Sequence, residues 1–403
     1  MSENHLAPGP KPPDRASLLV VYATVFVYFL GFHALLPIIT PYAISLGASV
    51  GVAGLIAGAY SAVNLVGNLG AGYWTDRLGR KLPLVVGLAV VGLALLLYPL
   101  AGDPATLFWL RIVHGLGAAL VAPASLSYIG DTTVPGGRAR AMAVYGAAIG
   151  LTTLIGPPLA GVVADRLGYA PVFFLLAVVT LAVTVPALLR TREILPEAAR
   201  SRDGQVRRLL GRRRLLVAYA ATFCLLFSLG TLIVFVPLAG EALGFSSARV
   251  GLVFAAFALA ATVIQLLPVG RLSDRWGREP LIMLGLAVLM GALLLLPGLE
   301  RWGTWLAAML LYGTGFGLMF PAMTALIADE TEPQTRGTAS GVFTAVFSLG
   351  ASLGTGSAGA MVWLQGTVGL HPFQVAALVA LLGAAWAGIA WARRLRWPDA
   401  KAS

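Results

Sequence analysis

The chain has 403 residues, of which 58% are hydrophobic and only 11% are charged, with a formal net charge of +11. Soluble domains carry about 25% charged residues, so this composition excludes an ordinary soluble domain. The charges fall in short runs between apolar stretches of about 20 residues, which are long enough to cross a bilayer as helices. None of these stretches alternates as barrel strands do, and we therefore expect an all-α integral membrane protein.

Residues 1–16 are polar and rich in proline, and we expect them to form a disordered cytoplasmic N-terminus. The apolar run that follows is too long for the core of a signal peptide and lacks a small-residue cleavage site, so it is expected to stay as the first span. Twelve spans are expected in the whole chain, at residues 17–43, 50–73, 82–101, 104–129, 139–162, 171–190, 214–240, 248–270, 280–298, 303–328, 337–365 and 372–395.

A charged cluster, GYWTDRLGRK at 72–81, follows the second span. Gly72 permits close approach of a neighbouring helix, and Gly79 permits a tight turn. Asp76 is placed to meet a helix N-terminus, where the dipole favours a carboxylate. The basic members of the cluster can bind lipid phosphate or nearby acids, and they are Arg77, Arg80 and Lys81. The alternative is a solvated turn with no role in transport.

The fourth span contains a buried charge in the segment LRIVHGLGAA. Arg111 lies about seven residues, roughly 10 Å, from the outer end of the helix. A charge at that depth is costly and usually faces a cavity or a partner, so it marks a functional site. His114 lies three residues further on and shares its helix face. The alternatives are that Arg111 snorkels outward or is held by backbone carbonyls, and that His114 is a structural histidine.

Other polar or aromatic groups in the spans are candidates to line a cavity. Tyr60 and Asn64 are four residues apart and therefore share one helix face. We expect one pocket in the middle and outer half of the bilayer, lined by His33, Tyr60, Asn64, Arg111 and His114. Gln265 would face them from the second half of the chain, where Tyr312 is a further candidate. Lone hydroxyls and amides often bond to helix backbone instead.

The fifth span carries GLTTLIGPPLAG at 150–161. Pro157 removes a helix hydrogen bond and bends the helix. Gly156 and Gly161 let a neighbouring helix lie close to that bend. Ordinary helix packing, with no bearing on the direction of transport, is the alternative.

The polar segment 191–213 is expected to be a basic cytoplasmic linker, with an amphipathic helix on the membrane surface. Cys224 is the only cysteine, so the chain alone can form neither a disulfide nor a thiolate metal site. The sequence G-x-x-x-x-G-K-[ST] is absent, which excludes the phosphate-binding loop of an ATP-driven pump. We expect no cofactor and no metal.

The second half of the chain repeats the first. Residues 270–279 read GRLSDRWGRE, and this copy begins 198 positions after the one at 72–81. The same offset relates further positions of the two halves, namely Gly115 to Gly313, Asp131 to Asp329, Arg138 to Arg336, Gly156 to Gly354 and Gly161 to Gly359. We therefore expect two six-helix bundles, at 17–190 and 214–395, followed by a cytoplasmic tail at 396–403. Two membrane repeats with a shared site between them are typical of a secondary transporter.

Basic residues set the expected orientation. The outer loops carry only Arg166, Arg249 and Arg301, whereas the remaining Lys and Arg residues, apart from Arg111 within the fourth span, fall on the other side, which predicts cytoplasmic termini. The charge of +11 is then explained by topology and by anionic lipid at the inner face, without nucleic acid.

Twelve spans in two six-helix halves, with G-x-x-x-D-R-x-G-R-[RK] between spans two and three, resemble the major facilitator superfamily. The resemblance covers nearly the whole chain and implies the major facilitator fold and a monomer. The segment with Gly156, Pro157 and Gly161 is similar to the signature of 12-helix drug/proton antiporters, although Ala160 stands where that signature has glycine.

The resemblance also implies roles for residues. The motif aspartate, Asp76, would cap a helix of the opposite half, and a motif arginine would pair with an acid that ends span four, which Asp131 matches. These contacts would hold the outward-facing state closed on the inside. The second copy of the gate would consist of Gly270, Asp274, Arg275, Gly277, Arg278, Asp329 and Arg336. Glu279 replaces the expected base, so we expect a weaker second latch. Arg111 matches an arginine tied to proton coupling.

Many exporters of cationic drugs in this family carry a carboxylate deep in the first half, and this chain has none there. A neutral, zwitterionic or anionic substrate is therefore expected. The coupling proton would have to be carried by His33, His114 or Asp76, and uniport remains an alternative.

The sequence thus predicts a non-enzymatic, alternating-access transporter in the cell membrane that exports a small amphipathic molecule in exchange for protons. An uptake permease or a uniporter for a sugar or other small metabolite is the alternative. A polytopic membrane enzyme or a sensor is a more remote one, because an enzyme acting on lipids would need clustered acids, histidines or cysteines at a membrane face.

Overall fold

The computed structural model describes residues 15–133, 137–194, 209, 211–332 and 335–396, and within these ranges it leaves the side chains of 15, 68–77, 138–139, 270, 336–337 and 393–396 undescribed. The described chain consists of helices joined by turns, without strands. Of the expected disordered N-terminus, Arg15 and Ala16 belong to the first helix, and the rest lies outside the described residues. The expected surface helix in the linker and nearly all of the tail at 396–403 also lie outside them.

The first half contains the helices α1 (Arg15–Ala34), α2 (Ile39–Ser45), α3 (Val50–Leu78), α4 (Lys81–Leu97), α5 (Pro104–Thr132), α6 (Arg138–Leu167) and α7 (Tyr169–Arg190). The second half contains α9 (Arg213–Ala242), α10 (Ser247–Leu266), α11 (Val269–Trp276), α12 (Arg278–Leu295), α13 (Trp302–Asp329), α14 (Arg336–Gly356), α15 (Ala358–Val368) and α16 (Pro372–Arg396). Among the described residues, 12 helices are long and apolar enough to cross a membrane, which confirms the predicted all-α, 12-span architecture.

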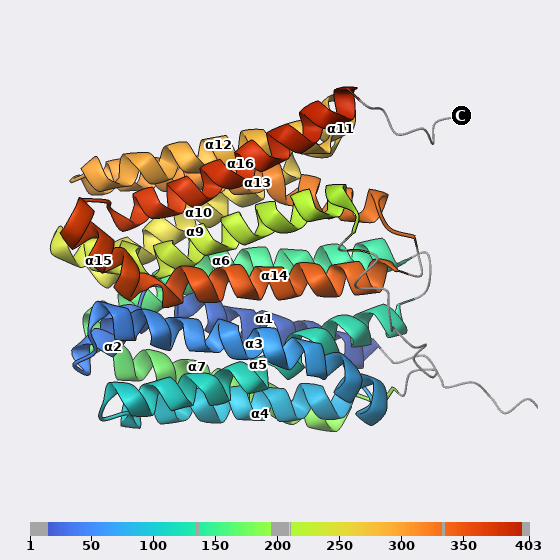
Figure 1. Ribbon diagram of the computed structural model, residues 1–403. Coiled ribbons are helices and arrows are strands. Elements are labelled where there is room, and N and C mark those ends of the chain that lie inside the picture. Colours follow the sequence, from blue (N-terminus) through green and yellow to red (C-terminus); the bar gives the residue numbers. More distant parts are fainter. Residues whose placement is uncertain (1–14, 134–136, 195–208, 210, 333–334, 397–403) are drawn as a thin grey trace, which may run out of the picture.

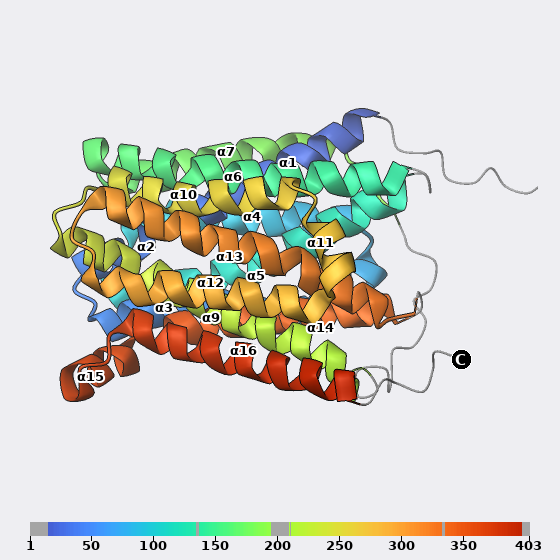
Figure 2. The same ribbon diagram turned by 90° about the horizontal axis from the view of Figure 1, so that it is seen from above.

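The helices of each half gather on one side of the molecule. In Figure 1, α1–α5 and α7 occupy the lower part and α9–α13 and α16 the upper part, while α6 and α14 run at middle height, and Figure 2 shows the same bundle turned by 90°. We call the end where α7 ends at Arg190 and α9 begins at Arg213 the linker end, and the opposite end the far end. The helix pairs α6/α10 and α3/α14 bring the two halves into contact.

Three expected spans are interrupted in the structure. The span at 17–43 breaks after α1, where the chain turns through 35–38, because Pro37 cannot donate a helix hydrogen bond. The span at 248–270 breaks after Leu266, because the residue before Pro268 is held in an extended conformation. The span at 337–365 breaks at Gly356–Ser357, so that α15 forms a separate short helix at the far end.

The internal repeat is visible in the packing. A Cβ on Gly87 of α4 would lie 2.7 Å from the carbonyl oxygen of Gly117 in α5. At the corresponding positions of the second half, a Cβ on Gly285 of α12 would lie 2.7 Å from the carbonyl oxygen of Gly315 in α13. Both pairs of helices therefore approach at the same point through the same missing side chains, as expected for homologous halves.

Helix N-termini at the far end are capped by side chains. Ser49 Oγ accepts a hydrogen bond from Val52 N at 3.3 Å, and Ser246 Oγ accepts one from Arg249 N at 3.4 Å. Asp103 accepts from both the hydroxyl and the backbone N–H of Thr106, and these bonds hold the pKa of the Asp103 carboxyl below its ordinary value. Such caps fix where each helix begins.

Candidate functional site

Arg111 of α5 is buried in the first half and is held by α3. Its Nε donates to the carbonyl oxygen of Ile56 at 3.3 Å, and its Nη2 donates to that of Ala57 at 3.1 Å. The guanidinium carbon also lies 4.8 Å from the centre of the Tyr60 ring, in a cation–π contact. Backbone carbonyls of α3 and the Tyr60 ring therefore hold the charge within the bundle, and a role of Arg111 in transport stays a prediction.

Tyr98, in the short 3₁₀ turn after α4, joins Arg111 to His114. Its hydroxyl accepts from Arg111 Nη1 at 3.4 Å and lies 2.8 Å from His114 Nδ1. The His114 ring also meets the Tyr60 ring edge-on, with centroids 5.1 Å apart. The hydroxyl of Tyr60 in turn lies 3.0 Å from that of Tyr28 in α1. We call these five residues the Arg111 network, which is drawn from α1, α3, α5 and the turn after α4.

His33 forms a second polar group, between α1 and α6. Its Nδ1 lies 3.1 Å from Thr152 Oγ1, and its Nε2 lies 3.1 Å from Thr153 Oγ1. A Cβ on Gly156 would lie 3.2 Å from His33 Cβ, so the missing side chain of Gly156 lets α6 approach the histidine. Phe32 links this group to the Arg111 network, because its ring lies 5.2 Å from His33 and 5.5 Å from Tyr60.

Two of the residues expected in the same pocket, Gln265 and Tyr312, lie elsewhere, whereas Asn64 stays on the helix of Tyr60. Asn64 is half-buried one turn beyond Tyr60 on α3. Tyr312 is enclosed within the second half, where its hydroxyl lies 2.8 Å from Ser228 Oγ and its ring packs on Phe257. Gln265 is exposed one residue before the linker-end terminus of α10, whereas the Arg111 network lies toward the far end. The structure does not place Gln265 or Tyr312 against that network.

The first copy of the gate motif lies at the linker end, between α3 and α4. Gly79 ends α3 with a φ of +84°, a conformation that glycine adopts without strain. Arg80 is buried, and its Nε lies 3.0 Å from Asp131 Oδ2 at the end of α5. The backbone N–H of Lys81 donates to Glu193 Oε1 at 3.0 Å, so the start of the linker packs on this turn. The motif members Gly72, Asp76 and Arg77 belong to α3, and their side chains lie outside the described part.

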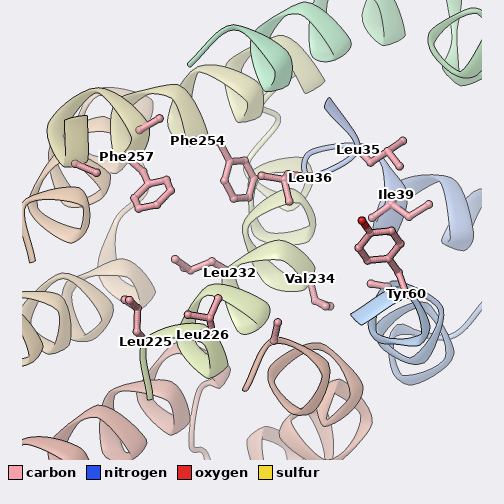
Figure 3. Packing of buried hydrophobic residues seen from close by; sticks show 14 of the residues in the cluster. Leu35, Leu36, Ile39, Tyr60, Leu225, Leu226, Leu232, Val234, Phe254 and Phe257 are labelled. Carbon is pink, nitrogen blue, oxygen red and sulfur yellow. The ribbon is translucent and has the colours of Figure 1, made fainter. Parts of the chain in front are cut away.

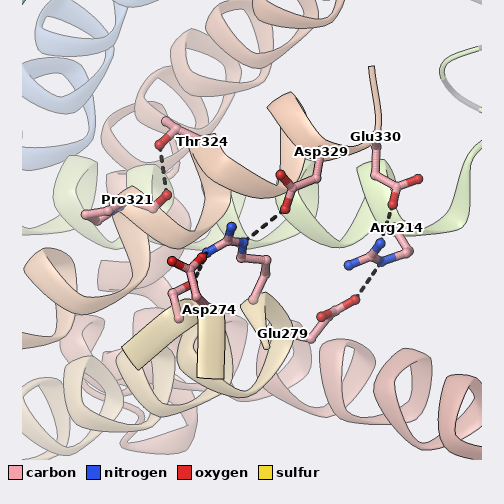
Figure 4. A network of polar contacts seen from close by, with 9 residues as sticks. Arg214, Asp274, Glu279, Pro321, Thr324, Asp329 and Glu330 are labelled. Carbon is pink, nitrogen blue, oxygen red and sulfur yellow. Dashed lines mark hydrogen bonds and ion pairs between the residues drawn. The ribbon is translucent and has the colours of Figure 1, made fainter. Parts of the chain in front are cut away.

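The second copy has the same geometry at positions 198 residues later. Gly277 ends α11 with a φ of +93°, and Arg278 Nε lies 3.0 Å from Asp329 Oδ2. Arg278 Nη1 also binds Asp274 Oδ1 at 2.6 Å, as Figure 4 shows. Arg275 is exposed, Gly270 belongs to α11, and the side chain of Arg336 lies outside the described part.

Glu279 stands where the first copy has Lys81, and it forms an ion pair of its own. Its carboxylate is buried and accepts from Arg214 Nε of α9 at 2.8 Å. The same arginine binds the carboxylate of Glu330 at the end of α13 (Figure 4). The second copy therefore joins α9, α12 and α13 within its own half. Whether it is the weaker latch between the halves stays a prediction.

The two halves meet at the far end through glycines. Gly161 of α6 lies against the carbonyl of Ser247 in α10, and Gly251 of α10 lies against the carbonyl of Pro157. On the other side, a Cβ on Gly51 of α3 would lie 3.1 Å from the Cα of Gly359 in α15. We call these contacts the α6/α10 seam and the α3/α15 seam. The predicted bend in the fifth span is therefore part of the surface that joins the halves.

Buried apolar side chains from both halves fill the space between the seams. Figure 3 shows this cluster, in which Leu36 and Tyr60 come from the first half and Phe254 and Leu232 come from the second. The far end of the molecule is thus closed by backbone contact and by apolar packing.

Several residues of these sites were missed from the sequence. Tyr98 could have been found from the sequence, because it places a hydroxyl at the end of an apolar span, next in the chain to the span that contains the buried Arg111. Arg214 was harder to find. An acid at position 279 in place of a base predicts a basic partner, but not which residue it is. The hydrogen bonds of Thr152 and Thr153 to His33 could not be predicted, because threonine is common in membrane helices and its presence does not indicate a partner.

The family model described as Major Facilitator Superfamily matches residues 21–355 of the chain, and again residues 218–402. The chain belongs to the Major Facilitator Superfamily. It is therefore a transporter and a multi-pass membrane protein, and not an enzyme, which confirms the resemblance that the sequence motifs suggested.

Relatives and solved structures agree with this assignment. The chain is 26% identical over 382 residues to "Multidrug resistance protein 2" of Bacillus subtilis (strain 168), covering 92% of this chain and 94% of that protein. A bacterial homologue of the human lysosomal transporter Spinster, solved in an inward-facing and unoccupied conformation, superposes with a TM-score of 0.82 at 17% identity, over 97% of this chain and 100% of that chain. A D-xylose–proton symporter superposes with a TM-score of 0.74 at 16% identity, over 92% and 96% of the two chains.

Proposed function

We propose that this Major Facilitator Superfamily transporter exports a small amphipathic molecule in exchange for protons. The molecule is neutral, zwitterionic or anionic. The printed name of the Bacillus subtilis relative, a multidrug resistance protein that aligns along nearly all of this chain, supports efflux. The basic residues at the linker end support an orientation in which that end, with both termini, faces the cytoplasm and anionic lipid of the cell membrane.

The α6/α10 seam is the observation that carries the proposal. Pro157 and Gly161 belong to the segment that resembles the antiporter signature, and they contact Gly251 and Ser247 of the opposite half. A transporter that works by alternating access needs a contact between its halves that forms in one state and opens in the other. The α6/α10 seam is a candidate for such a contact, and the bundles at 17–190 and 214–395 would rock about the site between them.

The charge of the Arg111 network supports the proposed substrate class. The guanidinium of Arg111 has carbonyl oxygens and the Tyr98 hydroxyl as its hydrogen-bond partners in the described structure, and no carboxylate is among them. A permanently charged guanidinium without an acid attracts anions and repels cations. This electrostatic environment favours an anionic, zwitterionic or neutral substrate over a cationic one.

Aromatic side chains of the second half support the amphipathic character of the substrate. The ring centroids of Phe257 and Phe316 lie 5.4 Å apart, and those of the stacked rings of Phe316 and Phe320 lie 5.2 Å apart. Phe343 extends the row, with its ring centroid 6.1 Å from that of Phe320. Such a row offers apolar surface for a ring or chain of the substrate. The polar network of the first half and the aromatic row of the second half complement the two ends of an amphipathic molecule.

His33 is the favoured carrier of the coupling proton. Both ring nitrogens lie within hydrogen-bond distance of threonine hydroxyls on α6. Hydroxyls can accept as well as donate, so these threonines can serve either charge state of the imidazole. Because Gly156 of the bend packs against the same histidine, protonation of His33 acts on the helix that forms the α6/α10 seam.

Uptake or uniport of a sugar or other small metabolite is the alternative function. The same fold is found in a D-xylose–proton symporter, so the fold by itself does not decide the direction of transport. We favour export because the relative named for multidrug resistance has the higher sequence identity, 26% against 16% for the symporter.

Transport by purified protein in liposomes tests the proposal. A thermal-shift screen of neutral, zwitterionic, anionic and cationic amphipathic compounds first identifies ligands. Each ligand is then loaded into liposomes that contain a pH-sensitive dye, and we expect proton movement only when a bound ligand moves in the opposite direction. Ligand flux that ignores a pH gradient would exclude proton exchange, and preferential binding of cationic compounds would exclude the proposed substrate class.

A further inference from the structure

Asp165 of α6 joins the two halves through a pair of hydrogen bonds at the far end. Its Oδ1 accepts from the backbone N–H of Ser247 at 2.7 Å, and its Oδ2 accepts from that of Ala248 at 2.9 Å. These two N–H groups open helix α10 of the opposite half and have no acceptor within that helix. The carboxylate therefore caps a helix across the boundary between the halves, where the helix dipole also favours its negative charge.

The contact lies beside one of the two closest approaches in the α6/α10 seam. Gly161 lies one helical turn before Asp165 and packs against the carbonyl of Ser247. Ser246 Oγ serves the next N–H, that of Arg249, from within the second half. Asp165 thus completes the cap of α10, and separation of the halves at this end has to break both of its hydrogen bonds.

The internal repeat shows that the cap is found in only one of the two seams of the described structure. The offset of 198 residues relates Gly161 to Gly359, and it relates Asp165 to Trp363. Trp363 is 65% exposed, and an indole cannot accept hydrogen bonds from a helix N-terminus. In this seam α3 is capped from within its own half, by Ser49. The halves therefore share a carboxylate at the α6/α10 seam and only close packing at the α3/α15 seam.

We propose that Asp165 is a positioning residue of the transport cycle, which holds the far end closed by capping α10 from the opposite half. When the halves separate at this end, water takes over both the carboxylate and the freed N–H groups. The α3/α15 seam lacks such a cap and opens or bends without that loss. This inference rests on the alternating-access part of the proposed function, and it is independent of the substrate, the direction of transport and the coupling ion.

The experiment measures the distance between the halves directly. Spin labels are attached at Leu167 and Leu243, which are exposed on opposite sides of the α6/α10 seam, in a variant whose only native cysteine is removed by Cys224→Ala. Pulsed electron spin resonance on this protein in lipid, without substrate, then gives the populations of short and long distances. Asp165→Asn should raise the ratio of long to short distances by about tenfold, as expected for the loss of a hydrogen bond to a charged group.

Two further variants keep the test decisive if Asp165→Asn is poorly folded. Ser247→Pro removes the N–H of Ser247, together with its hydroxyl, at the first position of α10, where proline is well tolerated, and should shift the ratio in the same direction. Asp103→Asn is the matched control, because Asp103 caps a helix of its own half at the same end, and it should leave the distances unchanged.

The outcome distinguishes the role of Asp165 from the proposed function. Unchanged distances in both Asp165→Asn and Ser247→Pro would overturn the role of Asp165, even if proton-linked export is demonstrated. A shift in both variants would establish the role, even if liposomes show uptake or uniport in place of export. A shift of equal size in Asp103→Asn would also overturn it, because any lost cap would then open the far end.

Discussion

Arg80 and Asp131 form an ion pair with Nε and Oδ2 3.0 Å apart, and the residues 198 positions later, Arg278 and Asp329, form the same pair at the same distance. In each half the arginine opens one helix and the aspartate ends another, so the pair joins two helices at the linker end. The duplication has therefore preserved a contact between atoms as well as a sequence motif. The residue that follows each arginine differs, and this difference leads to a prediction about stability.

Loss of Arg214 should destabilise the protein more than loss of Arg80. Asp131 is 40% exposed on its side chain and can be solvated when Arg80 is removed, so Arg80→Ala leaves no buried charge behind and should cost less. Glu279 is only 2% exposed, and Arg214→Ala leaves its carboxylate buried without that partner, which should cost about 3–5 kcal/mol. Thermal unfolding of the purified variants in detergent measures the difference.

A second substitution checks the cause of that difference. Glu279→Gln in the Arg214→Ala protein removes the buried charge and should recover part of the lost unfolding temperature. If the double variant unfolds at the same temperature as Arg214→Ala, or if Arg80→Ala is the more harmful single change, the buried charge does not explain the stability.

Arg111 should be required for transport but not for insertion into the membrane. Arg111→Lys keeps the charge but cannot reach Ile56, Ala57 and Tyr98 with separate donors in fixed directions. We expect Arg111→Ala to abolish measurable transport and Arg111→Lys to reduce the rate by roughly tenfold or more, with normal amounts of both proteins in the membrane. Flux at the parent rate in Arg111→Ala would show that the arginine only supports the packing of α3 on α5.

The sequence predicted those features that depend on composition and repetition. Twelve apolar stretches predicted the spans, and the offset of 198 residues predicted that Arg278 and Asp329 are counterparts of the first gate copy. The sequence did not predict where the spans break. Proline and glycine occur within unbroken membrane helices as well, as Pro157 and Gly161 do in α6, so the presence of Pro37 and Gly356 did not by itself mark the breaks.

The candidate site was predicted only in part, for a related reason. Helix periodicity correctly placed His114 on the face of Arg111, but it carries no information on which helices meet. Gln265 was expected opposite Arg111, yet its helix ends at the next residue, near the linker end. The contacts of Asp165 were also not predicted, because its acceptor role depends on a helix of the other half.

A variant that cannot be protonated at position 33 should still transport substrate but should no longer couple transport to protons. Asparagine can exchange hydrogen bonds with Thr152 and Thr153, as His33 does, but it cannot take up a proton near neutral pH. We expect His33→Asn to retain exchange of labelled for unlabelled substrate while losing accumulation driven by a pH gradient. Both rates are measured in the same liposomes.

His371 provides the control for that experiment. It lies at the far end before α16, and partial burial lowers the pKa of its imidazole. A lowered pKa keeps His371 neutral around neutral pH, so His371→Asn should preserve gradient-driven accumulation. If the pH gradient drives the same accumulation of substrate in His33→Asn as in the parent protein, another group carries the proton.

The close approach of α6 to α10 should tolerate no side chain at Gly161. A Cβ there would meet the backbone of Ser247 and Ala248, which cannot rotate away as a side chain can. Gly161→Ala should therefore hold the far end partly open, lower the transport rate several-fold and lengthen the distance between spin labels at Leu167 and Leu243. Gly146 of the same helix has open space around its Cα, so Gly146→Ala should change neither quantity. A parent-like distance in Gly161→Ala would show that the α6/α10 seam adjusts to added volume and does not set the closed state of the far end.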